Sequence, residues 1–379
     1  MGHPLAISQS LFLIVPFVMP MIMNLDKSIV LTSADLLDGE TIKLDLLRYG
    51  WYHIYAAFTG TSSDNRYPFN VILIDQYKKE FSVGQIAWET VDGYYIKGVE
   101  MIAPITIFNR NNERLQKTEF TIYIVSTQVH PFPVASTQWI KGSADLHGGL
   151  DIQRLEPMGV TILNADPLFT LRDFDIGQYG MKSVEAGALT VKTAGYDMLS
   201  HNFDVFQVTW MNAPRSSFVT LADPIATVYR LNGSLTFWCT FDKFENFSPF
   251  VRPGSTFSVV SPGWANGVNT YAYQYPFHDF THTIYDFGRD TLMFLDATVN
   301  DINVGEEVIV SVRNVKGEAT TIGYKVRMYA NRRIVRGRTL EVAVVAPTPN
   351  HIPQYLIHVS SVALKNLSLV PGMLILLLL

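Results

Sequence analysis

Residues 281–300, THTIYDFGRDTLMFLDATVN, decide the class of fold. They hold two short apolar runs of the type found in β-strands, separated by a turn of small residues around Gly288. Residues 229–241, YRLNGSLTFWCTF, have a similar construction. From 234 to 241, one face carries Leu, Phe, Cys and Phe, while the other carries Ser, Thr, Trp and Thr, as the two-residue period of a strand requires. Neither stretch contains residues typical of catalysis, so both indicate a structural framework.

Short strand-type runs continue through most of the chain. They occur at 41–47, 51–58, 69–77, 94–108, 120–125, 203–210, 234–241, 256–264, 281–287, 291–299, 306–315, 324–330 and 339–347. No long stretch keeps the helical period of an amphipathic helix. Short strands at this spacing predict an all-β chain, built as sandwiches or barrels.

The strand-type runs form two blocks, one ending near residue 130 and one beginning near residue 201. The segment between these two blocks has a different composition. It is rich in turn residues and has only scattered apolar anchors, which predicts an extended loop-rich connector. The expected organisation is an apolar N-terminal arm at 1–23, an N-terminal β-sandwich domain at 24–133, the connector at 134–200, an eight-stranded sandwich domain at 201–347 and an apolar C-terminal arm at 348–379.

The composition is poor in charge. Only 17% of the 379 residues are charged and 48% are apolar, whereas an ordinary soluble domain carries roughly a quarter charged residues. Such a surface exposes apolar area unless it is covered, so we expect large contacts with other chains. The formal net charge of -5 excludes a globally basic nucleic-acid binder. Cys239 is the single cysteine, which excludes an intrachain disulfide and a cysteine-based metal site.

Both ends of the sequence are strongly apolar. Residues 11–23 read LFLIVPFVMPMIM, and residues 367–379 end in MLILLLL. Both stretches are shorter than the about 20 residues that cross a bilayer, and prolines interrupt them. We therefore expect no stable membrane span. Arms that pack against neighbouring subunits are the favoured interpretation, and membrane contact is the alternative.

Three motifs follow one another between residues 229 and 295. They are YRLNGSLTF at 229–237, FSVVSPG at 257–263, and THTIYDFG at 281–288 before the apolar strand 292–295. In this order they resemble the jelly-roll coat proteins of picornavirus-like viruses, over roughly residues 200 to 347. Two positions depart from the family pattern. A Trp often fills the place of Tyr285, and the usual double proline is reduced to Pro262.

The resemblance implies that residues 201–347 form an eight-stranded viral jelly roll. It also implies a structural capsid protein of a small icosahedral positive-strand RNA virus, with no enzymatic activity and no cofactor. Its partners would be copies of itself, sister capsid proteins and viral RNA, and the sequence identifies no host receptor. Its location would be the virion, with assembly in the host cell cytoplasm. Two β blocks on one chain are similar to the comovirus large coat protein, and an insect or algal relative fits equally.

Six basic residues form the densest positive charge in the chain. Strand alternation places the first two on one face, and the sequence of the other four is typical of a turn. Three interpretations fit: contact with packaged RNA, whose phosphates bind irrespective of base sequence, pairing with acids of a neighbouring subunit, or a solvated strand edge. The residues are Lys325, Arg327, Arg332, Arg333, Arg336 and Arg338.

Few other motifs suggest chemistry. Residues 172–175, RDFD, resemble the Asp-Asp-Phe element of some insect picorna-like coat proteins, which is associated with autocatalytic maturation cleavage. Asp173 and Asp175 are the candidate acids, although Arg replaces the first Asp and a loop acid pair bonded to backbone amides is commoner. His278 and His282 lie four residues apart without further ligands, so we expect no metal site. The sequence has no GxSxG, P-loop, GxGxxG or HExxH motif.

Two other classes of function remain open. A carbohydrate-binding β-sandwich adhesin or lectin-like protein would use tryptophans as a platform, although Trp in strands is more often core or interface. A glycosidase on a β-sandwich would need two carboxylates at a fixed distance in a cleft. The tryptophans are Trp51, Trp88, Trp139, Trp210, Trp238 and Trp264.

Overall fold

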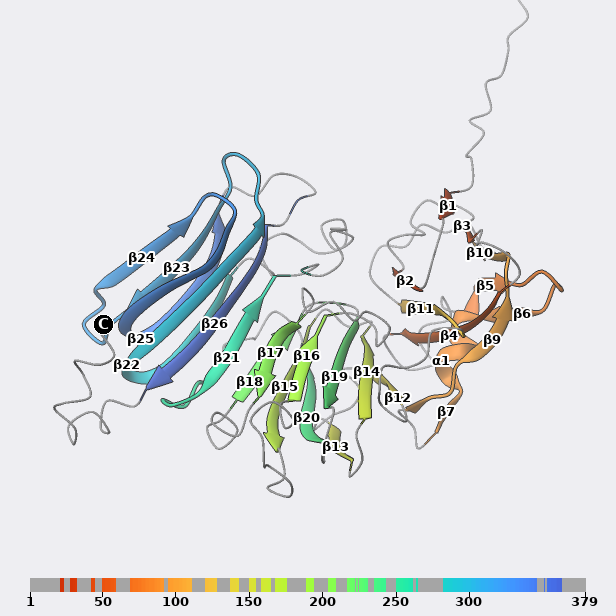
Figure 1. Cartoon of the computed structure of the whole chain (residues 1–379), viewed down its shortest axis with the longest axis horizontal. Coiled ribbons are helices and arrows are strands. Elements are labelled where there is room, and N and C mark those ends of the chain that lie inside the picture. The colour runs from red at the N-terminus through yellow and green to blue at the C-terminus, as the bar shows by residue number, and fades with distance from the viewer. Residues whose placement is uncertain are drawn as a thin grey trace, which may run out of the picture.

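The computed structural model of the chain is built almost wholly of β-strands, and its described residues contain one six-residue helix (Figure 1). The all-β class expected from the sequence is confirmed. The described residues are 21–23, 28–32, 42–44, 50–58, 69–91, 95–110, 120–127, 137–142, 150–154, 158–164, 168–175, 189–193, 204–208, 217–221, 223, 225–230, 235–242, 250–261, 264, 282–345, 351 and 353–362.

Two sheets share one core in the N-terminal part of the chain. One has the strand order β1-β3-β10-β5-β6 and the other β2-β11-β4-β9. Buried Ile54 and Ile122 from the second sheet pack with Leu73 and Ile107 from the first. Two sheets around a shared core form a β-sandwich, as expected here. The strands are β1 (Met21–Met23), β2 (Ser28–Thr32), β3 (Ile42–Leu44), β4 (Trp51–Phe58), β5 (Val71–Ile74), β6 (Glu80–Ser82), β9 (Val99–Ile102), β10 (Ile105–Asn109) and β11 (Phe120–Ser126).

Helix α1 (Val83–Trp88) packs on this core through Val83 and Ile86. It begins with a capping box. The Ser82 hydroxyl accepts from the Gln85 amide at 3.1 Å, and the Gln85 side-chain oxygen accepts from the Ser82 amide at 2.9 Å. Both bonds satisfy amides near the helix start that the short helix itself leaves without partners.

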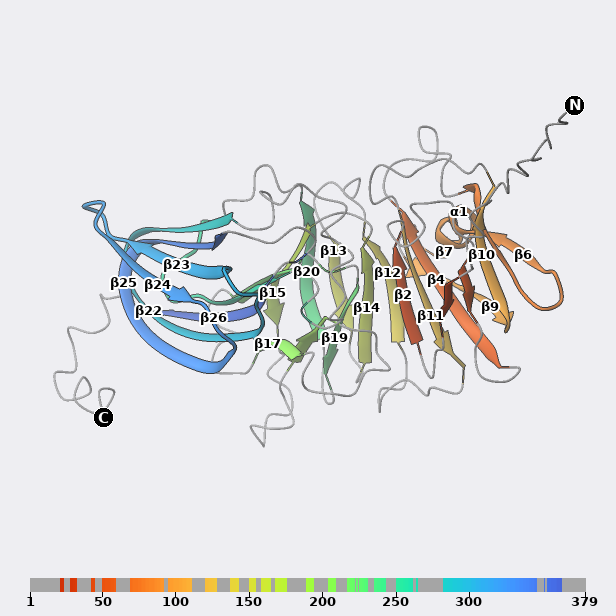
Figure 2. The same ribbon diagram turned by 90° about the horizontal axis from the view of Figure 1, so that it is seen from above.

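A seven-stranded sheet joins the N-terminal part to the middle of the chain. Its order is β17-β16-β19-β14-β12-β8-β7. Tyr55 and Tyr123 of the first sandwich pack in one buried cluster with Leu163 and Ile225 of this sheet, and Figure 2 shows the two regions side by side. The strands are β7 (Thr90–Val91), β8 (Tyr95–Ile96), β12 (Thr137–Gly142), β14 (Met158–Asn164), β16 (Leu189–Lys192), β17 (Asp204–Val208) and β19 (Ile225–Arg230).

The segment expected as a loop-rich connector contains five strands, and this corrects its expected secondary structure. They are β12, β13 (Leu150–Arg154), β14, β15 (Leu168–Asp175) and β16. Four of them, β13 to β16, pair with β19 or β20 (Leu235–Asp242), which lie far along the sequence, and β12 pairs with β14 and β8. All four residues of β16 are buried, so its faces do not alternate. Short strands without alternation resemble loops in a sequence. The domain boundaries remain a prediction.

A ten-stranded sheet continues into the C-terminal part. Its order is β13-β20-β15-β18-β21-β26-β22-β25-β23-β24. Two of its strands are unusually long, β22 with 20 residues and β25 with 18. The strands not yet given are β18 (Ser217–Leu221), β21 (Thr256–Val260), β22 (His282–Asp301), β23 (Glu307–Arg313), β24 (Ala319–Tyr324), β25 (Met328–Val345) and β26 (Gln354–Val362).

The two long strands bend together and so belong to two layers. Their register shifts between Asp286 and Thr291, opposite Thr339 and Gly337. Before the bend, β22 pairs with the part of β25 that also pairs with β23; after it, β22 pairs with β26 and with the first part of β25. Gly288 lies at the bend with φ +69°, a conformation that glycine adopts without strain.

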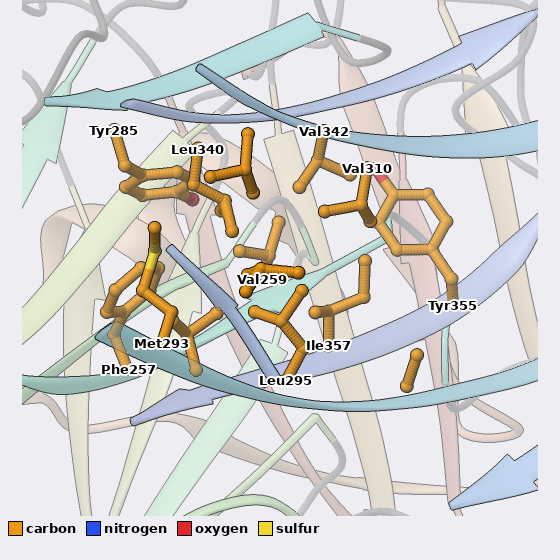
Figure 3. Close-up of a cluster of buried hydrophobic side chains, with 14 of the residues drawn as sticks. Phe257, Val259, Tyr285, Met293, Leu295, Val310, Leu340, Val342, Tyr355 and Ile357 are labelled. Atoms are coloured by element: carbon orange, nitrogen blue, oxygen red, sulfur yellow. The ribbon is translucent and has the colours of Figure 1, made fainter. Parts of the chain in front are cut away.

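The core of this C-terminal sandwich lies between the two layers (Figure 3). Tyr285 and Leu340 point inward from one layer, and Met293 and Leu295 point inward from the other. In the second part of β22, buried and half-buried residues alternate from 291 to 300. The apolar runs of the opening stretch therefore form strand, as predicted, and the second run has one face buried in the sandwich.

The assignment of strands in this sandwich differs from expectation. The expected strand 324–330 spans the end of β24, the connection at 325–327 and the start of β25. The runs 281–287 and 291–299 are one bent strand, because Gly288 and the register shift allow the chain to turn without ending the pairing. Residues 354–362, expected in an apolar C-terminal arm, form β26 between β21 and β22. Their apolar character fits burial in a sheet, because six of the nine residues are buried, four of them consecutively from Gln354 to Ile357. Most of the N-terminal arm lies outside the described residues.

Candidate interaction surface

The basic cluster follows β24 and continues along β25. Lys325 and Arg327 lie in the connection between the two strands, whereas residues 332–338 are strand and not the turn that the sequence suggested. All six basic side chains are exposed. The extended strand spreads them along its length instead of gathering them at one point.

Four of the six basic residues pair with acids of the same chain. The bonds are Lys325–Glu307 at 3.4 Å, Arg327–Asp301 at 3.1 Å, Arg332–Asp296 at 3.2 Å and Arg338–Asp286 at 3.1 Å. Three of the acids come from β22, since its register with β25 places acid opposite or near base. This arrangement favours the interpretation of a solvated strand surface for those four residues, because their charge is already balanced within the chain.

The pair between Arg338 and Asp286 has the most defined geometry. The hydrogen bond from Arg338, together with the amide of Gly288 at 2.7 Å, holds the pKa of Asp286 below its usual value against a smaller opposing effect of burial. The remaining two bases differ. Arg333 donates to the Asn331 side chain at 3.2 Å, and Arg336 makes no ion pair among the described residues.

The two candidate maturation acids lie in β15, which corrects their expected placement in a loop. The pairing of β15 with β20 shifts register between Arg172 and Asp175. The side chains of Asp173 and Asp175 lie outside the described part of the structure, as do His278 and the side chain of His282. The role in maturation cleavage therefore stays a prediction.

A histidine clasp that the sequence did not indicate lies at the far end of β22. The His351 ring approaches Glu306 through Nδ1 at 2.9 Å and Asp301 through Nε2 at 3.3 Å. Glu306 also accepts from the Asn303 amide at 2.8 Å, and Asp301 also pairs with Arg327. The clasp ties the segment before β26 to the end of β22. Because 50 residues separate His351 from Asp301, no local pattern announces it.

Three polar side chains, Ser258, His358 and Asp296, lie on the adjacent strands β21, β26 and β22 of the ten-stranded sheet. The Ser258 hydroxyl lies 2.7 Å from His358 Nδ1, and His358 stands opposite Asp296 in the register of β26 and β22. Burial lowers the pKa of His358, while the charge of Asp296 acts in the opposite direction. Ser258 is fully buried, so a substrate has no access to its hydroxyl. The serine, histidine and aspartate are therefore an internal polar network and not a nucleophilic triad.

Other kinds of site find no support within the described residues. There, no group of three or more His, Cys, Asp or Glu side chains is arranged to hold a metal ion. The same residues include no helix of the length and apolar character that crossing a membrane requires.

Comparison with known proteins gives no family assignment. No family model matches the chain, and no curated protein matches it. Among solved structures, the CUB1-EGF-CUB2 domain of human MASP-1/3 is similar over 56% of this chain and 93% of that chain, at 8% identity and a TM-score of 0.20. The infectious bursal disease virus Gx strain is similar over 90% and 73%, at 9% identity and a TM-score of 0.14. The VP2 subviral particle of that virus is similar over 84% and 72%, at 8% identity and a TM-score of 0.14. At these TM-scores the likenesses carry no argument about function.

Proposed function

We propose that the chain is a structural capsid protein of a small icosahedral positive-strand RNA virus. It would assemble in the host cell cytoplasm with copies of itself and sister capsid proteins, and would reside in the virion without catalytic activity. The observation that carries this proposal is the order of three motifs, YRLNGSLTF, FSVVSPG and THTIYDFG, between residues 229 and 288. That order resembles picornavirus-like jelly-roll coat proteins.

The third motif has a structural role that supports the proposal. It forms the bend at which β22 passes between the two layers of the C-terminal sandwich. Asp286 accepts the Gly288 amide at 2.7 Å, and Tyr285 fills the core with its fully buried ring. The motif residues therefore serve the framework, as residues of a coat protein would.

The edge of the ten-stranded sheet offers a route for subunit contact. Strand β24, ATTIGY, is the last strand of that sheet and contains no proline and no charged residue. Natural proteins usually protect such edges with charge, proline or a bulge, because an open edge pairs with strands of other chains. An unprotected edge supports a protein that functions in an assembly.

Exposed apolar side chains also support a protein that functions in an assembly. Tyr77, Phe250, Val304 and Tyr329 are each more than two thirds exposed. Single exposed apolar residues are normal on a monomer. Together with a charged fraction of only 17%, however, they support burial of this surface against other subunits.

Electron microscopy of the protein expressed with its sister capsid proteins tests the proposal. We expect closed particles over some range of salt and pH. Thr321→Lys places a charge on the exposed edge of β24 and should reduce particle formation while leaving the melting temperature unchanged. Ser360→Lys, at an exposed position on β26, which lies inside the same sheet and not at its edge, is the matched control. A protein that stays monomeric under every condition would overturn the proposal.

Carbohydrate binding is a second candidate, and the exposure of two tryptophans favours it. Trp51 and Trp88 are 52% and 56% exposed, and aromatic rings of this kind can present an apolar face to a ligand. A glycan array tests it directly. Binding that is lost in a Trp51→Ala, Trp88→Ala double variant with an unchanged melting temperature would support this candidate, and the absence of any glycan signal would reject it.

A further inference from the structure

A second set of cations gathers at the bend of the C-terminal sandwich, and most of it was not part of the basic cluster expected from the sequence. Strand register and close backbone contacts show that these residues lie near one another. Arg336 stands opposite Leu292, just after the bend of β22. A Cβ atom built on neighbouring Gly337 would lie 2.7 Å from the Arg313 carbonyl oxygen, so Arg313 lies directly beside it.

The turn between β23 and β24 is held at the same bend. The Val315 amide donates to Asp290 at 2.9 Å, and this bond places the adjacent Lys316 near Arg289, the neighbour of Asp290. Arg289 is itself part of the bend in β22. Arg289, Arg313, Lys316 and Arg336 are all exposed.

These four cations make no ion pair in the described part of the chain, although acids are close. Asp286 is bound by Arg338, and Asp290 accepts the Val315 amide. Glu318 accepts the Asn314 side chain at 2.7 Å. With Arg338 included, five cations and four carboxylates (Asp286, Asp290, Glu318 and Glu341) leave this corner with a net charge of +1, whereas the whole chain carries -5. The corner is thus a local reversal of the charge of the molecule.

An exposed aromatic ring adjoins the cations. Phe250 is 68% exposed and lies against the bend, because a Cβ built on Gly288 would be 3.0 Å from the ring. Its position is held by the backbone, since Phe250 bridges to Asp286 and the Val251 amide donates to the Asp286 carbonyl at 2.8 Å. The exposure therefore reflects a fixed backbone position and not a loose side chain.

We propose that this basic-aromatic corner, formed by Phe250, Arg289, Arg313, Lys316 and Arg336, binds single-stranded RNA. The cations contact phosphates, and a base stacks on Phe250. Charged grooves with exposed rings bind single strands in this manner, without preference for base sequence. An acidic peptide would satisfy the cations but would leave the ring unused, so the ring favours RNA. The identification of the natural RNA as a packaged genome rests on the proposed capsid function. The proposed binding of RNA does not depend on that function.

Fluorescence anisotropy with a labelled oligouridine RNA measures the binding, on protein kept below the concentration at which particles form. If four phosphates are contacted, the slope of log affinity against log salt is about -2.8. The variant Arg289→Ala, Arg313→Ala, Lys316→Ala, Arg336→Ala should lose at least about tenfold in affinity and most of that slope. Phe250→Ala should lose roughly 5-fold or more through the lost stacking, and Phe250→Tyr should retain affinity.

A matched control removes three cations that already have acid partners. Lys325→Ala, Arg327→Ala, Arg332→Ala changes the net charge nearly as much and should stay within about twofold of the wild type, since paired surface charges contribute little. Melting temperatures of all variants show that they fold. Equal losses in the corner and control variants would overturn the proposal, as would polyglutamate competing as well as RNA.

The experiments distinguish a failure of the RNA-binding proposal from a failure of the capsid proposal. Particles that form while oligouridine fails to bind would sink the RNA proposal alone. RNA binding by a protein that never assembles would sink the capsid proposal alone.

Discussion

Arg338 grips Asp286 with two parallel hydrogen bonds, from Nε to Oδ1 and from Nη2 to Oδ2, both at 3.1 Å. The pair joins β25 to β22 at the place where both strands change layer. A bidentate pair fixes the relative position of two planar groups more tightly than a single bond does. The bend of the C-terminal sandwich therefore has an ion pair on its outer side and Tyr285 on its inner side.

Replacing Arg338 with Gln should reveal the acid dependence of this pair. The folded pKa of Asp286 lies below its ordinary value of 3.8, so the contribution to stability is complete above that value and is lost as the pH falls through the folded pKa. We expect the variant to melt slightly below the wild type at neutral pH, and the difference to shrink as the pH falls below 3.8 and to vanish below the folded pKa. Thermal unfolding by circular dichroism measures both. A difference that is constant with pH would contradict this account.

Replacing His358 with Asn should change stability in a different pH range. Its pKa is lowered by burial from the ordinary 6.5, so the unfolded chain takes up the proton more readily than the folded one. Stability is then complete above about pH 6.5 and decreases as the pH falls toward the folded pKa. Ser258 from β21 and Asp296 from β22 face the ring, and Arg332 from β25 pairs with that aspartate.

The Asn variant keeps a partner for Ser258 but has no proton to gain. Its melting temperature should therefore vary less than that of the wild type between about pH 7 and pH 5. His53→Asn, at a half-buried histidine of the N-terminal sandwich, controls for a general loss of histidine. Identical pH profiles for the wild type and the His358 variant would show that the ring does not titrate in this range.

Phe257→Ala should remove a central contact of the C-terminal core. The fully buried Phe257 ring stacks on Phe218 with centroids 4.7 Å apart and planes 7° apart, and it also contacts Tyr285 at 4.7 Å. Truncating a buried Phe costs about 3–5 kcal/mol, which urea denaturation can measure. Val304→Ala, at a fully exposed position, should change stability by less than about 0.5 kcal/mol.

Gly337→Ala and Gly159→Ala form a matched pair of strand substitutions. A Cβ at Gly337 would meet the Val312 side chain and lie 2.7 Å from the Arg313 carbonyl oxygen, a backbone atom that cannot move aside cheaply. A Cβ at Gly159 would find its nearest neighbour at 3.8 Å, which is ordinary contact. We expect Gly337→Ala to destabilise by about 1–3 kcal/mol and Gly159→Ala to be nearly neutral. Equal melting temperatures for the two variants would contradict the expected clash.

Local patterns in the sequence predicted the strands that alternate and missed those that do not. The alternation of Met293, Leu295 and Ala297 with half-buried neighbours marks β22 plainly. Strand β16 is buried on both faces, and β26 is mostly buried in a terminal apolar segment, so neither shows a period of two. Continuous burial erases the alternation on which sequence-based assignment depends.

The sequence predicted which basic residues gather at the candidate surface but not their acid partners, because those pairs depend on strand register. The sequence shows that bases gather between residues 325 and 338, but not that Asp296 meets Arg332 or that Asp286 meets Arg338. Pairing 52 residues apart is set by the fold of β22 against β25. Arg313 joins the corner through the register of β23 with β25, and Arg289 lies in the bend of β22, so no spacing in the sequence brings them together.

The position of β26 has a consequence for the order of synthesis. This strand lies between β21 and β22 in the sheet, yet it follows both in the sequence, by 93 residues from Val260 to Pro353 in the one case. Until it leaves the ribosome, its two neighbours present bare hydrogen-bonding edges, which can pair with other chains. The ten-stranded sheet is therefore completed only when β26 inserts between β21 and β22. A chain whose translation stops before β26 keeps two unpaired strand edges and is prone to aggregate.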